Sequence, residues 1–275
     1  MRRLKIVLAY DGSDLVGWQR QRAGRSVQGQ LEDALAAIEG RPITVVGAGR
    51  TDAGVHALGQ VASCRIDHPM PIATLARALN AMLPGDIRVQ RVDEAPESFH
   101  ARCSARGKTY RYLLLNADFV SPFERRYVWH LPHAIDVSAM TEAARLLVGE
   151  HDFAALQGAG SAVKTTVRTM AAVTIRESAP VETVGLFLSP ADRPDGGRLI
   201  VFEMTGNGFL RHMVRNAVGS LVDIGVGRRE PRWLAGVLAS RDRTRAGATA
   251  PASGLSLVSV EYEAPSSLAP LVGSL

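Results

Sequence analysis

The sequence has only two cysteines, few aromatic residues and no long apolar run. Cys64 and Cys103 stand far apart, without CxxC spacing and without a neighbouring pair of histidines. Neither a disulfide scaffold nor a zinc site is therefore indicated, and we interpret both residues as buried free thiols. The apolar stretch before Tyr10 and Asp11 is too short for a signal peptide or a membrane span, so we expect a cytoplasmic protein.

The remaining composition is that of an ordinary globular protein. Of the 275 residues, 46% are hydrophobic and 21% are charged, which suffices for one large core or two of ordinary size. The formal net charge is +5, and 29 of the 32 cations are arginine. Residues 98–111 carry four cations and no acid, and residues 205–250 carry eight arginines against three acids. These stretches fit either a polyanion-binding surface or a solvated basic face.

Hydrophobic periodicity and capping residues predict alternating strands and helices. The expected strands are residues 4–10, 42–46, 60–66, 87–92, 109–116, 127–131, 169–176, 183–188, 199–204 and 255–262. The expected helices are the segment between Ser26 and Gly40 and residues 71–83, 136–148, 208–226 and 231–240. This order predicts an α+β fold of two similar mixed or antiparallel sheets, either separate or fused edge to edge, with helices on one side and the active-site cleft between them. The expected domains are residues 1–105 and 106–275.

The stretch from Gly47 to Ala57 has the densest set of chemically useful residues, and it lies between two predicted strands. Asp52 is its only carboxylate, and Arg50 stands two residues before it. A loop held by strands can present such groups to a ligand, which makes Asp52 the first candidate for chemistry. An Asp before Ala-Gly is also a common turn former, and the local sequence leaves both interpretations open.

Three further patterns are ambiguous by themselves. Tyr110 and Tyr112 share one face of a predicted strand, where they fit a hydrophobic core or a base-stacking surface. Arg211 and Arg215 are four residues apart in the predicted helix 208–226, so both should lie on one side of it. The glycine pairs at 47 and 49 and at 206 and 208 are incomplete dinucleotide fingerprints, which disfavours a nicotinamide or flavin cofactor.

Several stretches together resemble the tRNA pseudouridine synthase A family, and they extend over nearly the whole chain. The matching stretches are residues 8–13, 17–19, 49–57, 99–102, 110–112, 208–219, 242–244 and 249–255. The central one, Gly-Arg-Thr-Asp-Ala-Gly-Val-His-Ala, is far more specific than a glycine-rich loop. Ser256 departs from the tyrosine that relatives often carry there, and the tail after Tyr262 is longer than expected.

The resemblance implies an isomerase that converts uridine to pseudouridine at positions 38, 39 and 40 of the tRNA anticodon arm, without metal or organic cofactor. It assigns Asp52 as nucleophile or base and Arg215 as its ion-pair partner. It also implies that Tyr110 stacks on the target uracil, that Leu255 forms an apolar wall, and that Arg50 fills the space left by the flipped nucleotide. Which atom Asp52 attacks stays open.

The resemblance further implies that Arg102 and Arg211 grip phosphates and that the protein is a homodimer with tRNA as its partner. We interpret His56 and His212 as structural, because the chemistry does not require an imidazole. Two other functions stay open at this point. One is an RNA-binding module with the same basic cleft but no turnover, and the other is a nucleotide-dependent enzyme that uses the glycine-rich loop.

Overall fold

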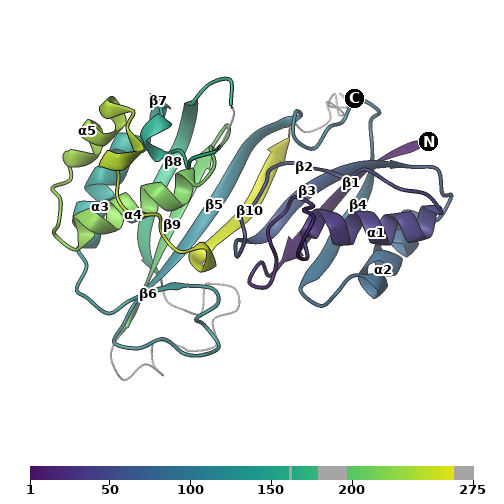
Figure 1. Ribbon diagram of the computed structural model, residues 1–275, viewed down its shortest axis with the longest axis horizontal. Helices are drawn as coiled ribbons and strands as arrows, with labels where there is room; N and C mark the ends of the chain where they lie inside the picture. Colours follow the sequence, from purple (N-terminus) through teal and green to yellow (C-terminus); the bar gives the residue numbers. More distant parts are fainter. Residues whose placement is uncertain (161–162, 179–196, 263–275) are drawn as a thin grey trace, which may run out of the picture.

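One continuous β-sheet runs through the molecule in this computed structural model, which describes residues 1–160, 163–178 and 197–262 (Figure 1). The main path of the sheet is β4-β1-β3-β10-β5-β9-β8-β7, with β2 paired to β3 and β6 paired to β5. The strands are β1 (Arg2–Tyr10), β2 (Val46–Gly47), β3 (His56–Ile66), β4 (Ile87–Ala95), β5 (Ala105–Asn116), β6 (Trp129–Leu131), β7 (Gly149–Asp152), β8 (Val167–Ser178), β9 (Arg198–Gly206) and β10 (Leu255–Tyr262).

The two predicted halves meet at β10, the last described strand of the chain. β10 pairs parallel to β3 of the first half and antiparallel to β5 of the second. The α+β class with mixed strand pairing is confirmed, and the two expected sheets are fused into one. β5 begins at Ala105, so the domain division at residue 105, which we keep as a proposal, falls at the start of this strand.

The helices form two groups at the two ends of the sheet (Figure 1). They are α1 (Val27–Glu39), α2 (Ile72–Met82), α3 (Val137–Ala144), α4 (Met213–Gly225) and α5 (Trp233–Ser240). The caps of α1 are as predicted: the Ser26 hydroxyl accepts a hydrogen bond from the Gly29 N–H, and Gly40 ends the helix with a left-handed φ of 76°. No helix in the described part of the chain is long and apolar enough to cross a membrane.

Both helix groups cover the same face of the sheet. Residues directly opposite one another on paired strands point to the same side, and the pairs Tyr10↔Ala57, Ala57↔Leu257, Leu257↔Tyr110 and Tyr110↔Met204 carry one face across the junction. These side chains belong to one buried cluster together with apolar residues of α1 and of α4. The predicted packing of helices on one side is therefore confirmed.

The predicted strand at 42–46 is wrong except for its end, because only Val46–Gly47 pairs as β2. The preceding backbone bonds to side chains of α1 instead: the Val45 N–H donates to Glu32 Oε1 at 3.1 Å, and Gln28 Nε2 donates to the Val45 carbonyl at 3.0 Å. Hydrophobic periodicity does not show whether the backbone groups of a segment bond to a neighbouring strand or to side chains of a helix. The predicted strand at 183–188 lies outside the described residues.

The two cysteines differ in their burial. Cys64 is a buried free thiol, as expected, whereas Cys103 is exposed, so the interpretation of both thiols as buried is wrong for Cys103.

The predicted helix at 208–226 begins five residues late, at Met213. His212 has a left-handed backbone, with φ 60°, and a residue in that conformation cannot continue an α-helix. Arg211 therefore lies in the turn before α4, and the expectation that Arg211 and Arg215 share one side of a helix is wrong.

Candidate active site

The loop that carries Asp52 is held in place by the segment after β1. The hydroxyls of Tyr10 and Thr51 are hydrogen bonded at 2.8 Å, and the Trp18 N–H donates to the Thr51 carbonyl at 3.0 Å. A Cβ atom at Gly47 would lie 2.4 Å from the Trp18 ring, so only glycine allows this approach. Burial raises the pKa of Tyr10 to about 12, which keeps its hydroxyl neutral and able to donate. The backbone on either side of Asp52 is thus fixed before any substrate binds.

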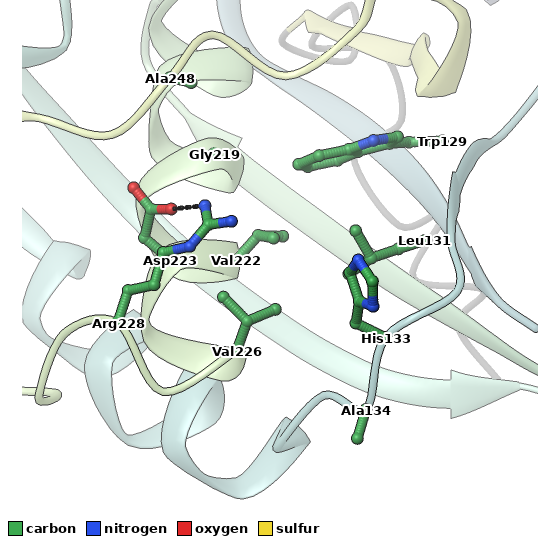
Figure 2. Close-up of a pocket in the computed structure, with 10 residues that line it drawn as sticks. All are labelled: Trp129, Leu131, His133, Ala134, Gly219, Val222, Asp223, Val226, Arg228 and Ala248. Carbon is green, nitrogen blue, oxygen red and sulfur yellow. Dashed lines mark hydrogen bonds and ion pairs between the residues drawn. The ribbon is translucent and has the colours of Figure 1, made fainter.

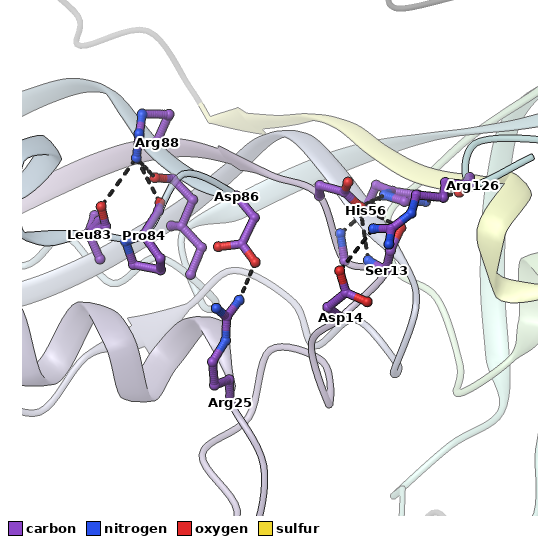
Figure 3. Close-up of polar contacts among 12 residues, drawn as sticks. Ser13, Asp14, Arg25, His56, Leu83, Pro84, Asp86, Arg88 and Arg126 are labelled. Atoms are coloured by element: carbon purple, nitrogen blue, oxygen red, sulfur yellow. Dashed lines mark hydrogen bonds and ion pairs between the residues drawn. The ribbon is translucent and has the colours of Figure 1, made fainter. Parts of the chain in front are cut away.

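His56 joins three loops behind this site (Figure 3). Its Nδ1 lies 3.1 Å from the Gly12 N–H and 3.2 Å from Asp11 Oδ1, and its Nε2 faces the carbonyl oxygens of Arg126 and Ser253 at 3.0 and 3.1 Å. Burial pushes the pKa of Asp11 upward, but hydrogen bonds from its neighbours, His56 first, hold it far below the usual range. Every contact of this imidazole goes to the scaffold, which supports the structural interpretation of His56.

Asp52 faces the N-terminal end of α4 across the junction of the two halves. Its Oδ2 atom lies 3.7 Å from Arg215 Nη1 and 3.4 Å from His212 Nε2. The Asp52 side chain is 32% exposed, whereas that of Arg215 is 16% exposed. The partial exposure of the carboxylate leaves it accessible to a substrate, while the nearby cation stabilises its negative charge. The structure therefore brings the predicted pair Asp52 and Arg215 together.

The segment between α5 and β10 orients the Arg215 side chain. Its Nε donates to the Ala250 carbonyl at 2.7 Å, and the Ala250 N–H donates back to the Arg215 carbonyl at 3.1 Å. Gly219, one turn further along α4, lets the same segment approach, because a Cβ there would lie 1.7 Å from the Ala248 carbonyl oxygen. The guanidinium is thereby fixed on the side of α4 that faces Asp52.

Tyr110 and Leu255 lie beside this pair on the helix-covered face of the sheet. Only 7% of Tyr110 and 5% of Leu255 are exposed. The Tyr110 ring packs edge-on against Phe209, with centroids 4.8 Å apart, and its hydroxyl is near the backbone of Gly49. Burial raises the pKa of Tyr110 well above its usual range, and the negative charge of nearby Asp52 adds to this effect. Tyr110 is thus a neutral aromatic wall next to the carboxylate.

The arginines expected to contact the substrate are on the surface of the protein: Arg50 for the vacated space, and Arg102 and Arg211 for phosphates. Arg50, Arg102 and Arg211 are exposed, and Arg211 donates to the Ala159 carbonyl at 2.9 Å. Lys108, which the sequence analysis counted only as one cation among four, lies next to Gly49. Its pKa is lowered by burial and then by the charges of Arg102 and Arg168, so several cations lie close together here.

The amino-acid sequence was compared with those of known proteins to identify its family. A sequence model described as "tRNA pseudouridine synthase" matches residues 6–103 and 143–263. Proteins named tRNA pseudouridine synthase A from Syntrophotalea carbinolica and Acetivibrio thermocellus are 42% and 40% identical, covering 94% and 95% of this chain and 96% and 100% of their own lengths. A protein of the same name from Solidesulfovibrio magneticus is 45% identical, covering 96% of this chain and 93% of its own.

The chain belongs to the tRNA pseudouridine synthase family. It is accordingly an isomerase that forms pseudouridine in tRNA, which decides against the non-catalytic module and the nucleotide-dependent enzyme. The matched ranges include Asp52, Arg215 and Leu255, whereas Tyr110 and β6 lie in the unmatched interval between them.

The sequence analysis did not assign His212 to the site of this synthase, although His212 lies nearer to Asp52 than Arg215 does. The available signal was its spacing, because a residue three positions before Arg215 is expected on the same side of a helix. Its actual position at the N-cap of α4 depends on a backbone conformation that spacing does not reveal.

A cavity of about 330 Å³ lies further along α4, away from Asp52 (Figure 2). Its α4 residues follow Arg215 by one to three turns, on the same side of the helix, and Trp129 and His133 lie opposite them. Asp223 and Arg228 form an ion pair of 3.0 Å at its edge. None of Asp52, His212 and Arg215 lines this cavity, so it is separate from the group around Asp52. In the ranges that the structure describes, no three His, Cys, Asp or Glu side chains are grouped to hold a metal ion.

Proposed function

We propose that this synthase isomerises uridine to pseudouridine at positions 38, 39 and 40 of the tRNA anticodon arm, with Asp52 as the reacting carboxylate. The observation that carries the assignment of Asp52 is its surroundings. It is a partly exposed carboxylate whose Oδ2 lies 3.4 Å from His212 Nε2 and 3.7 Å from Arg215 Nη1. A carboxylate that must stay charged near a buried base needs such a cation.

The reaction requires few groups besides Asp52 and Arg215. The bond between ribose C1′ and uracil N1 breaks, the base turns, and C5 bonds to C1′, after which C5 loses its hydrogen to solvent and N1 gains one. Asp52 attacks the nucleotide or removes a ribose proton, and the Arg215 guanidinium faces its negative charge in either route. Tyr110 and Leu255 form the walls between which the uracil stacks and turns, which supports their assignment to substrate binding.

A uridine paired in a stem has to leave the helix before it can reach Asp52, at a cost of a few kcal/mol. Arg50, exposed and two residues from Asp52, is suited to fill the vacated space. Arg102, Lys108 and Arg211 are suited to hold phosphates and set the register of the arm without reading its sequence. Such a grip accounts for one enzyme serving several neighbouring uridines.

Arg50→Ala is expected to slow modification of a paired uridine by about 10- to 100-fold, since the flipped state loses a stabilising contact worth a few kcal/mol. An unpaired uridine in the same sequence context should be affected much less. Tritium release from C5-labelled RNA measures both rates, and exposed Arg22→Ala is the matched control. Equal slowing of paired and unpaired substrates would remove Arg50 from this role.

We further propose, from the family resemblance, that the enzyme is a homodimer acting in the cytoplasm. The site specificity is tested by mapping pseudouridines in anticodon-arm transcripts incubated with the purified protein. The uridines at positions 38, 39 and 40 should all be converted to pseudouridine in buffer that contains a chelator and no cofactor. Conversion confined to uridines elsewhere in the tRNA would contradict the assignment of positions 38 to 40.

A further inference from the structure

The imidazole of His212 is the one group beside Asp52 to which the reaction as proposed gives no task. Its Nε2 lies 3.4 Å from Asp52 Oδ2, nearer than the Arg215 guanidinium at 3.7 Å. Its side chain is 25% exposed, so it borders the same opening as the carboxylate. We infer that His212 is a positioning residue that holds the Asp52 carboxylate in its reactive orientation through Nε2–H. This inference rests on the proposed role of Asp52.

The backbone is shaped to bring the ring to this place. His212 is one of two non-glycine residues in the described chain with positive φ, and it turns the chain into α4 at the point nearest Asp52. Its carbonyl accepts the Asn216 N–H at 2.8 Å, which ties the residue to the first turn of the helix. A left-handed conformation is costly for a residue with a side chain, and such strain persists where surrounding contacts determine it.

The other side of the ring is seated against a glycine. A Cβ atom at Gly158 would lie 2.6 Å from His212 Nδ1, so a larger residue there would displace the imidazole. The Gly158 N–H donates to the Arg211 carbonyl at 2.8 Å, which joins this segment to the turn before α4. The ring is thus held between Gly158 and Asp52 and has little freedom to rotate away.

Burial and the neighbouring arginines favour the neutral form of the His212 ring. Burial lowers its pKa most; Asp52 acts in the opposite direction, while Arg215, Arg211 and Arg243 lower it further. A positive charge at the N-terminus of α4 is also disfavoured by the helix dipole. Because the pKa is lowered, the ring gains its second proton only below its usual range. A neutral ring approaches a carboxylate oxygen favourably only with a ring N–H, so we assign the hydrogen of the neutral ring to Nε2.

Protonation of this ring would place a second full positive charge against Asp52 and make the carboxylate a poorer nucleophile or base. We therefore expect the single-turnover rate to fall as the pH drops through the lowered pKa of His212. His212→Gln keeps an N–H donor but cannot titrate, so its acid limb should move to lower pH. His212→Leu has the same cost of a left-handed backbone as His212→Gln, but it removes the side-chain hydrogen-bond donor.

The test compares these two variants with wild type and with exposed His133→Gln as control, using single-turnover tritium release and tRNA binding. We expect His212→Leu to lose about 10- to 100-fold in rate with unchanged tRNA affinity, since a small misplacement of a reacting group has effects of this size. His212→Gln should retain most of the rate.

A wild-type rate for His212→Leu, or an acid limb in His212→Gln identical to that of wild type, would overturn the inference. The pH profile of the His212→Gln rate tests the inference even if the His212→Leu variant does not fold. Wild-type protein that forms no pseudouridine at all would instead overturn the proposed function, so the two failures are distinguishable.

Discussion

Asp52→Ala is expected to abolish pseudouridine formation while leaving tRNA binding almost unchanged. The loss should be roughly 10⁴-fold or more, because removing the single reacting group of a site leaves only binding and electrostatic contributions. Binding should survive because the exposed cations around the loop, not the carboxylate, contact the phosphates. Single-turnover formation of product and filter binding of the same tRNA measure the two quantities separately.

Asp52→Asn sharpens this experiment, since it keeps the size of the side chain and removes only the charge. The exposed carboxylate variant Asp33→Ala is the matched control, and it should react at the wild-type rate. The structural interpretation of Asp52 as a turn former predicts a different result: Asn, which favours the same turn, would restore activity. Substantial product from either Asp52 variant would remove this residue from the chemistry.

Arg215→Leu is expected to reduce the single-turnover rate by about 10²- to 10³-fold, the usual effect of removing one group that stabilises charge in a site. The guanidinium lies 3.7 Å from Asp52 and is only 16% exposed, so its charge is poorly replaced by solvent. The variant also removes the hydrogen bond from Nε to the Ala250 carbonyl, and circular dichroism and thermal unfolding should show that the fold survives.

Arg215→Lys separates the two contributions, because it keeps a positive charge without the planar fork that reaches both Asp52 and Ala250. It should fall between wild type and Leu. Arg232→Leu, at a side chain that is 90% exposed, is the control for loss of one cation. A folded Arg215→Leu protein with a near-normal rate would show that Asp52 does not need this partner.

Local chemistry explains why much of the fold is predictable. The ends of α1 depend on Ser26 and Gly40, whose effects reach only a few residues along the chain. The strand β1 shows the expected alternation, because every second residue from Leu4 to Tyr10 is buried. The specific motif around Asp52 likewise lies within one stretch, and with the resemblance it made that residue the leading catalytic candidate.

Errors arose where distant segments compete with local preference. The strand expected at 42–46 is nearly lost because Gln28 and Glu32 of α1 bond to its backbone. The helix expected from 208 starts late because His212 takes a left-handed conformation that the hydrophobic pattern does not encode. Periodicity reports how residues along one segment are buried, and it contains no information on the partner of each polar group.

By itself, the sequence determined the types of most helices and strands, the α+β class and the family to which the motifs point. Tertiary structure alone decided that the two halves form one sheet through β10, and that His212 meets Asp52 beside Arg215. The physical reason is the separation along the chain over which each interaction acts. Caps, turns and alternation act between neighbours in the chain, whereas an ion pair between a loop of the first half and a helix of the second exists only once the whole sheet has formed.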